Sequence, residues 1–148
     1  MNGRQATVTI LMADDDEEDG LLVREALAES RLPIELHIVE NGEELMDYLY
    51  HRGLYTDIDK APRPSLILLD LNMPKKDGTE VLKEIKSNPK LWQIPVIILT
   101  TSSAEEDIVN TYNLGANSFI IKPANFTSLV EMMKTLGKYW FEIVKLPL

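Results

Sequence analysis

Short apolar runs rich in β-branched residues alternate along the chain with stretches in which apolar residues recur every three or four positions. The runs predict strands at Thr7–Ala13, Ile34–Val39, Ser65–Leu69, Pro95–Thr100 and Ser118–Ile121. The amphipathic stretches have the spacing of helices, so the predicted element order is βαβαβαβαβα. Nearly continuous apolar strands that alternate with helices indicate a parallel sheet with helices on both faces. The predicted fold is therefore α/β, with a doubly wound five-stranded parallel sheet.

Polar residues suited to helix capping stand before each amphipathic stretch. In chain order the candidates are Asp15 or Asp16, Asn41, Asp77 or Thr79, Ser102 with Ser103, and Thr127 or Ser128. Gly115 stands where the fourth helix should stop. The helices are thus expected to begin within a few residues after each strand.

The size of the chain, 148 residues, is about that of one ordinary domain, so a single domain over residues 1–148 is expected. Apolar residues make up 45% and charged residues 26%, which is a globular balance. One connection, residues 52–65, is longer than most loops, and loops of this length often serve a function.

The charge balance excludes several classes of function. There are 15 Lys and Arg against 24 Asp and Glu, and the net charge of −9 has the wrong sign for a protein that coats nucleic acid. With no cysteine, the chain offers neither a disulfide, a thiolate zinc site nor a cysteine nucleophile. The apolar run near the N-terminus is too short for a signal peptide or a membrane span, so a cytoplasmic protein without membrane contact is expected.

Acidic and other polar side chains stand at the ends of the predicted strands. Asp14 and Asp15 follow the first strand, Asp70 follows the third, Thr100 ends the fourth and Lys122 follows the fifth. Ligand sites in open parallel sheets lie at the carboxyl ends of the strands. If the strand order is 2-1-3-4-5, the first and third strands are neighbours, and three carboxylates meet at one edge of the sheet.

Three converging carboxylates predict a bound divalent cation. Two like charges about 4 Å apart repel by about 4 kcal/mol at an effective dielectric constant near 20, and a shared cation removes this cost. The two histidines, His37 and His51, are not near these strand ends, so the ligands are oxygens. Oxygen ligands favour Mg²⁺, with Mn²⁺ as an alternative, over zinc.

A carboxylate beside such a cation, facing the hydroxyl of Thr100 and the ammonium of Lys122, has the parts needed for phosphoryl transfer. Asp70 is the expected nucleophile, because Asp14 and Asp15 come from one strand end and can hold the cation from one side. The predicted product is an aspartyl phosphate (4-aspartylphosphate) at Asp70.

Four stretches, ADDDEED, LILLDLNMPKKDG, PVIILTTSS and FIIKPANF, occur in an order and at a spacing that closely resemble response-regulator receiver domains of two-component signalling. The resemblance extends from Thr7 to about Lys138 and leaves residues 139–148 as a C-terminal extension. It implies a flavodoxin-like fold and a single-domain response regulator that accepts a phosphoryl group from a histidine kinase and signals through protein contacts. The long loop and the stretch LNMPKKDGTEVLKEIKSNP are similar to stand-alone regulators of phytochrome-type kinases.

The resemblance also implies the roles of the metal-binding residues. Asp15, Asp70 and the backbone carbonyl of Asn72 would ligate Mg²⁺, and Asp14 would contact a water on the metal. Thr100 and Lys122 would contact the phosphoryl oxygens. Such a domain is a phospho-acceptor switch that promotes its own phosphorylation and dephosphorylation, rather than an enzyme acting on other substrates.

A conformational switch is implied as well, coupling Thr100 to an aromatic residue shortly before the lysine. Here that residue is Phe119, where tyrosine is common, so the hydroxyl of a tyrosine-type switch is missing and outward exposure of the ring is expected to be disfavoured. The Lys122–Pro123 peptide bond is expected to be cis, again by resemblance.

Two other functions deserve comparison. A haloacid-dehalogenase-type phosphatase also uses a strand-end aspartate and Mg²⁺, but it needs a second aspartate two residues on, where this chain has Asn72, and the chain is short for that family. A receiver-like binding module without phosphorylation is disfavoured because all five site residues, Asp14, Asp15, Asp70, Thr100 and Lys122, are present.

The C-terminal extension is rich in apolar residues: Tyr139, Trp140, Phe141, Ile143, Val144, Leu146 and Leu148. An apolar cluster beyond the part that a five-stranded sheet can cover indicates a partner surface. A homodimer through the last helix and this tail is the leading hypothesis, and the alternative is that the tail folds back on its own domain. The residues beyond the receiver are too few for an output domain, so output is expected to pass through a partner.

Overall fold

The computed structural model describes residues 8–146, which contain a five-stranded parallel sheet in the order β2-β1-β3-β4-β5. The strands are β1 (Val8–Ala13), β2 (Ile34–Val39), β3 (Leu66–Leu69), β4 (Val96–Thr100) and β5 (Ser118–Ile121). Neighbouring strands are all parallel. The predicted fold and strand order are confirmed, and the strands lie within a residue of the predicted runs.

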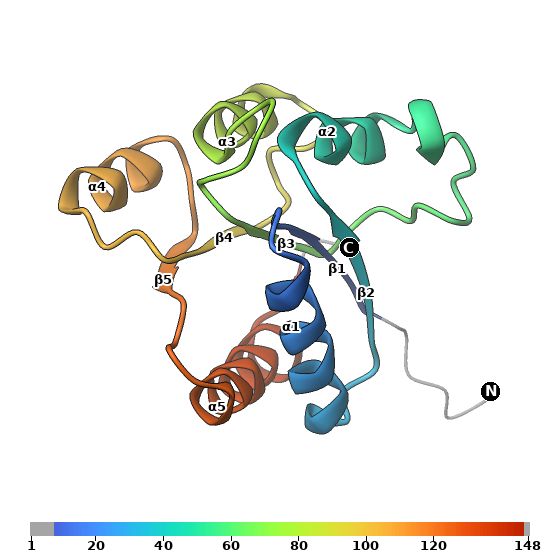
Figure 1. Ribbon diagram of the computed structural model, residues 1–148. Coiled ribbons are helices and arrows are strands. Elements are labelled where there is room, and N and C mark those ends of the chain that lie inside the picture. Colours follow the sequence, from blue (N-terminus) through green and yellow to red (C-terminus); the bar gives the residue numbers. More distant parts are fainter. Residues whose placement is uncertain (1–7, 147–148) are drawn as a thin grey trace.

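Helices cover both faces of the sheet, as Figure 1 shows. Helices α1 (Glu17–Ser30) and α5 (Phe126–Gly137) pack together on one face. On the other face lie α2 (Gly42–Tyr50) and α3 (Gly78–Ser87), with α4 (Glu105–Asn113) beyond them near the β5 edge. The arrangement is the doubly wound one that alternating strands and helices require.

The core consists of two apolar clusters, one on each face of the sheet. Alternate side chains of one strand enter different clusters: Ile67 and Leu69 pack toward α2 and α3, whereas Leu66 and Leu68 pack toward α1 and α5. All four residues of β3 are buried, which is why this strand reads as an uninterrupted apolar run.

Side-chain caps begin three of the helices as predicted. Asp16 accepts hydrogen bonds from the backbone at the start of α1, Asn41 does so for α2 and Asp77 for α3. Gly115, with φ of +106°, lies just beyond the end of α4 as expected.

The predicted caps of the last two helices are wrong. Helix α4 follows Ala104 without a side-chain cap, because Ser102 and Ser103 lie two residues and one residue before the cap position. The Ser102 hydroxyl donates to the Asp107 carboxylate at 2.7 Å. Helix α5 begins two or three residues earlier than Thr127 or Ser128 would require, since the Asn125 side chain accepts from the Ser128 amide at 2.8 Å.

The long connection contains a short 3₁₀ turn, η1 (Gly53–Tyr55), and is tied to α2. The Tyr48 hydroxyl donates to the Pro62 carbonyl oxygen at 2.8 Å, and His51 Nε2 lies 2.8 Å from the Ala61 carbonyl oxygen. These contacts hold the connection against the domain, while the side chains of Leu54 and Ile58 are exposed.

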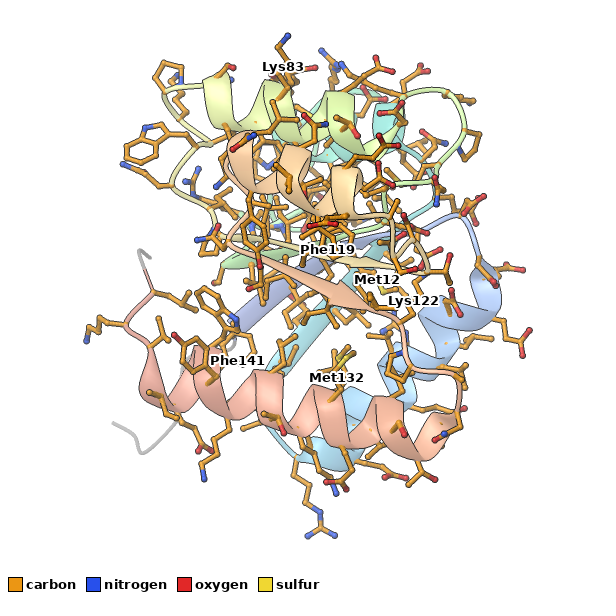
Figure 2. The ribbon with its side chains drawn as sticks, turned by 90° about the vertical axis from the view of Figure 1, so that its left-hand side faces the viewer. Met12, Lys83, Phe119, Lys122, Met132 and Phe141 are labelled. Carbon is orange, nitrogen blue, oxygen red and sulfur yellow. The ribbon has the colours of Figure 1, made fainter. Side chains whose placement is uncertain are left out.

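The C-terminal tail continues α5 as a π-helical segment, η2 (Lys138–Ile143). Trp140 and Phe141 are partly buried and pack against the cluster beneath α1 and α5; Figure 2 labels Phe141. Tyr139 and Ile143 remain 51% and 65% exposed. Part of the tail therefore folds back on its own domain and part stays open. Thr7, the predicted start of the first strand, and residues 147–148 of the tail lie outside the described range. Within residues 8–146, no helix has the length and apolar character needed to span a membrane.

Candidate functional site

Backbone hydrogen bonds continue the sheet past its strand ends and align the site residues. The Asp70 amide donates to the Ala13 carbonyl oxygen at 3.0 Å, and the Asp14 amide donates to Val39 at 3.0 Å. On the other side, the Lys122 amide donates to the Thr100 carbonyl oxygen at 2.8 Å. The ends of β1, β3, β4 and β5 thus meet at one edge, as the parallel order requires.

Three carboxylates converge at this edge. Asp14, Asp15 and Asp70 each offer an oxygen, and these oxygens lie within 4.8 Å of one another. Asp14 and Asp70 are buried, and Asp15 is exposed. A small hard cation fits this donor set, because Mg²⁺ takes one or two carboxylates and keeps several waters, which the exposed side of Asp15 can admit.

The Lys122 ammonium lies among the carboxylates, at the end of β5 (Figure 2). Its Nζ is 2.6 Å from Asp14 Oδ2, 2.7 Å from Asp19 Oδ2 and 3.3 Å from Asp70 Oδ2. The Lys122 side chain is only 11% exposed, so these ion pairs are weakly screened by water. Of the three partners, Asp14 and Asp70 are predicted site residues and Asp19 is not.

Burial changes the proton affinity of this site. It raises the pKa of Asp14 to about 6, although the Lys122 ammonium and the Asp16 amide, which donate hydrogen bonds to Asp14, oppose the shift. Burial also lowers the pKa of Lys122, but hydrogen bonds to Asp14 and Asp19 outweigh it, and the net pKa lies above the ordinary lysine value. Three carboxylates face this one ammonium, so the site keeps an excess of negative charge, which favours a cation.

Thr100 and Phe119 are the predicted switch pair. Thr100 is fully buried, and its hydroxyl accepts from the Ser102 amide at 3.4 Å. Phe119 is partly buried, and its side chain lies on the side of β5 that faces α4 (Figure 2) and packs against the core on the α3 side. Its amide donates to the hydroxyl of Tyr112 on α4 at 3.1 Å. The inward ring agrees with the expectation for a phenylalanine at this position; the switch itself remains a prediction.

The turn after β3 brings Asn72 beside Asp70. The Asn72 amide donates to Asp70 Oδ1 at 3.3 Å, so the turn orients the Asp70 carboxylate. A groove of about 440 Å³ opens over Asp15 and Asn72 and reaches Asp107 at the start of α4. This groove exposes the acidic edge to solvent and to the approach of a partner.

The structure corrects one expectation and adds one residue. Residues 8–146 contain no cis peptide bond, so the cis bond expected at Lys122–Pro123 is wrong for this conformation. Asp19 was missed because an acidic residue in the first turn of a helix is ordinarily a solvated, dipole-favoured group. Its position in the first turn of α1, three residues after Asp16, was the feature of the sequence that could have indicated it, because the start of α1 lies beside the strand ends.

Comparisons with known proteins agree with this geometry. The response regulator receiver domain family matches residues 10–134. Response regulator Rcp1 of Synechocystis sp. is 45% identical, over 93% of this chain and 92% of Rcp1. The crystal structure of the phosphorylated cyanobacterial phytochrome response regulator RcpA superposes with a TM-score of 0.90 at 45% identity, covering 97% of this chain and 100% of that one. The crystal structure of the Mn²⁺-bound form of Rcp1 gives a TM-score of 0.86 at 44% identity and covers 95% of this chain and 99% of that one.

Proposed function

Because this chain belongs to the response-regulator receiver family, we propose that it is a single-domain response regulator that accepts a phosphoryl group from a histidine kinase onto Asp70. The observation that carries the proposal is the convergence of Asp14, Asp15 and Asp70 on one edge, with the Lys122 ammonium 3.3 Å from the acceptor carboxylate. The family match is to receivers rather than to dehalogenase-type phosphatases, and Asn72 stands where those enzymes need an acid.

Asp70 acts as the nucleophile. A carboxylate oxygen of Asp70 forms a P–O bond as the P–N bond to the kinase histidine breaks, and the imidazole leaves with the electron pair of that bond. The Asn72 amide holds the other Asp70 oxygen in place. The Thr100 hydroxyl donates to one phosphoryl oxygen, and Lys122 moves from the Asp70 carboxylate to another.

Asp15 and Asp70 would hold Mg²⁺, or Mn²⁺, together with the backbone carbonyl of Asn72, and Asp14 would contact a water on the metal. The bound cation supplies positive charge that offsets the phosphoryl oxygens in the transition state. The Mn²⁺-bound form of Rcp1 supports this assignment, as does the excess of carboxylate over ammonium charge at the site. The same groups return the site to its unphosphorylated state when water attacks the phosphorus.

The experiment that tests the proposal is the mass of the intact protein after incubation with a phosphorylated kinase or with acetyl phosphate. We expect the mass to rise by one phosphoryl group, with a rate that depends on Mg²⁺. D70N, which keeps the size of the side chain, is expected not to gain mass. Labelling of D70N at the wild-type rate would contradict the assignment, and a wild-type protein that binds Mg²⁺ but is never labelled would favour the binding-module alternative.

The partner is a histidine kinase of the phytochrome type. The support is the 45% identity to RcpA, a cyanobacterial phytochrome response regulator, over nearly the whole of both chains. The net charge of −9 disfavours nucleic acid as a partner. Transfer from a phosphorylated phytochrome kinase should be faster than from an unrelated histidine kinase at equal concentration, and equal rates would remove this finer assignment.

A second copy of the chain is the partner proposed for the tail. An open groove of about 490 Å³ runs between β5 and α5 and is lined by Ile120, Met132, Tyr139 and Trp140. Sedimentation should show a dimer that dissociates on dilution, and Y139S should weaken it. L54S, which changes an exposed apolar side chain in the long connection, is the matched control. A monomer at all concentrations, phosphorylated or not, would contradict the dimer.

A further inference from the structure

Within residues 8–146, Asp19 contacts the site through Lys122. Its Oδ2 atom lies 2.7 Å from the Lys122 ammonium, whereas the group of three carboxylates that can share a cation is formed by Asp14, Asp15 and Asp70. The Asp19 side chain comes from the first turn of α1 and is 29% exposed, compared with 1% for Asp14. Asp19 is therefore placed to act on the lysine rather than on the metal or the phosphoryl group.

The three donors of the Lys122 ammonium are all used. An ammonium carries three N–H groups, and these face Asp14 at 2.6 Å, Asp19 at 2.7 Å and Asp70 at 3.3 Å. The longest contact is the one to Asp70, the proposed acceptor. This is the contact that Lys122 can exchange for a phosphoryl oxygen while two shorter ion pairs still hold its charge.

The space beside Lys122 means that its ammonium needs a fixed contact to stay in place. A cavity of about 140 Å³ lies against the lysine and is lined by Asp19 and by apolar side chains, including Met12, Leu22 and Leu99. This cavity gives the flexible lysine side chain room to leave its contacts. When a cation shares the charge of Asp14 and Asp70, their attraction for the ammonium weakens, while that of Asp19 does not.

We propose that Asp19 is a positioning residue that holds the Lys122 ammonium at the sheet edge while Lys122 exchanges the Asp70 carboxylate for a phosphoryl oxygen. The inference rests on the proposed function, since it assigns a role within phosphoryl transfer to Asp70. Asp19 itself neither receives the phosphoryl group nor ligates the cation.

The first test compares phosphorylation rates at saturating Mg²⁺. D19A should slow phosphorylation about tenfold, as expected for the loss of one charge-assisted hydrogen bond at a reacting centre. D19N keeps an oxygen that can accept from the ammonium and should recover part of the rate. E18A removes a neighbouring exposed carboxylate of the same helical turn and should leave the rate unchanged. Equal rates for D19A and E18A, or no recovery in D19N, would overturn the proposal.

The second test asks whether Asp19 acts through Lys122. In a K122A background, D19A should cause no further loss of rate, because the side chain that Asp19 positions is gone. A full additional loss in the double variant would show an independent role and overturn the proposal.

A spectroscopic measurement separates this inference from the proposed function. In protein with ¹⁵N-labelled lysine, the Lys122 ammonium signal, assigned by its absence in K122A, should be sharp in the wild type and in E18A. The signal should broaden or vanish in D19A. If the wild type is never phosphorylated, the proposed function fails whatever this signal does; if phosphorylation occurs and the signal persists unchanged in D19A, only the role of Asp19 fails.

Discussion

Gly78, the first residue of α3, lies directly against the backbone of Asp70. The Gly78 amide donates to the Leu71 carbonyl oxygen at 3.0 Å, and a Cβ atom at Gly78 would overlap the Asp70 carbonyl oxygen and the Leu71 Cα. The atoms in the way are backbone and have little freedom to move. The absence of a side chain at Gly78 is therefore what lets α3 begin immediately behind Asp70.

The first prediction is that G78A displaces the end of β3. We expect a loss of about 1–3 kcal/mol in the free energy of unfolding, as for overpacking at a tight site, together with slower phosphorylation of Asp70. Urea unfolding and intact mass measure the two effects. G20A is the control, because a Cβ there meets only the end of the Ile38 side chain, at 3.1 Å, and alanine favours the helix. Wild-type stability and rate in G78A would contradict the prediction.

The second prediction concerns the pH dependence of the metal-free protein. Because the folded state raises the pKa of Asp14 from 3.8 to about 6, the folded protein binds this proton more tightly than the unfolded chain does. The stability that Asp14 contributes should therefore fall as pH rises from about 4 to about 6, by at most about 3 kcal/mol, and stay level above that range.

D14N tests this assignment. The variant should lose that component of the pH dependence and should be more stable than the wild type without divalent cations at pH 7. Mg²⁺ should then stabilise D14N less than it stabilises the wild type. Thermal unfolding with and without Mg²⁺ at several pH values measures both effects, and an unchanged pH profile in D14N would assign the proton elsewhere.

The third prediction separates the hydroxyl of Thr100 from its size. T100V keeps the shape of this fully buried side chain and removes the hydroxyl, so we expect phosphorylation to slow about tenfold for one lost charge-assisted hydrogen bond. T100S keeps the hydroxyl and should stay near the wild-type rate. If T100S is as slow as T100V, packing rather than hydrogen bonding explains the effect.

The fourth prediction concerns the contact between α2 and α3. Lys76 donates to Glu84, and the Tyr50 hydroxyl donates to the same carboxylate at 2.7 Å. These contacts, of which the one from Lys76 has the larger effect, hold the pKa of Glu84 below its ordinary 4.5. The carboxylate therefore stabilises the protein above about pH 4.5 and loses that contribution as pH falls further.

Removal of this charge should have a small effect, because Glu84 is 30% exposed and water screens the ion pair. We expect E84Q to lower the free energy of unfolding at pH 7 by less than about 1 kcal/mol and to match the wild type near pH 3. E25Q, an exposed position in the middle of α1, should change neither value. A loss in E84Q that persists at low pH would indicate lost packing instead.

Caps illustrate where local sequence suffices and where it does not. Asp16, Asn41 and Asp77 are found as caps from sequence because the side chain needs only the amide two or three residues on. Ser102 is equally suited by type, but α4 begins only after Ala104, so Ser102 lies two residues before the cap position. Its hydroxyl donates to the Asp107 carboxylate, and the path of the whole turn decides where the helix begins.

The tail shows the same limit at longer range. Its apolar composition predicts an interface, yet composition does not distinguish a surface for a partner from one that covers the domain itself. The structure divides the segment: Trp140 packs against the α1–α5 side of the core, whereas Tyr139 stays half exposed. Successive residues of a helical segment point in different directions, so neighbours in sequence take opposite roles.

The sequence by itself determined the order of strands and helices and which polar residues end the strands, because both follow from hydrophobic periodicity and chain order. It therefore also indicated Asp14, Asp15, Asp70, Thr100 and Lys122 as the site. Only the tertiary structure decided which carboxylates the Lys122 ammonium contacts, and that Asp19 is among them. An ion pair depends on how far two side chains reach across space, and residues separated by more than a hundred positions have no relation that local pattern can express.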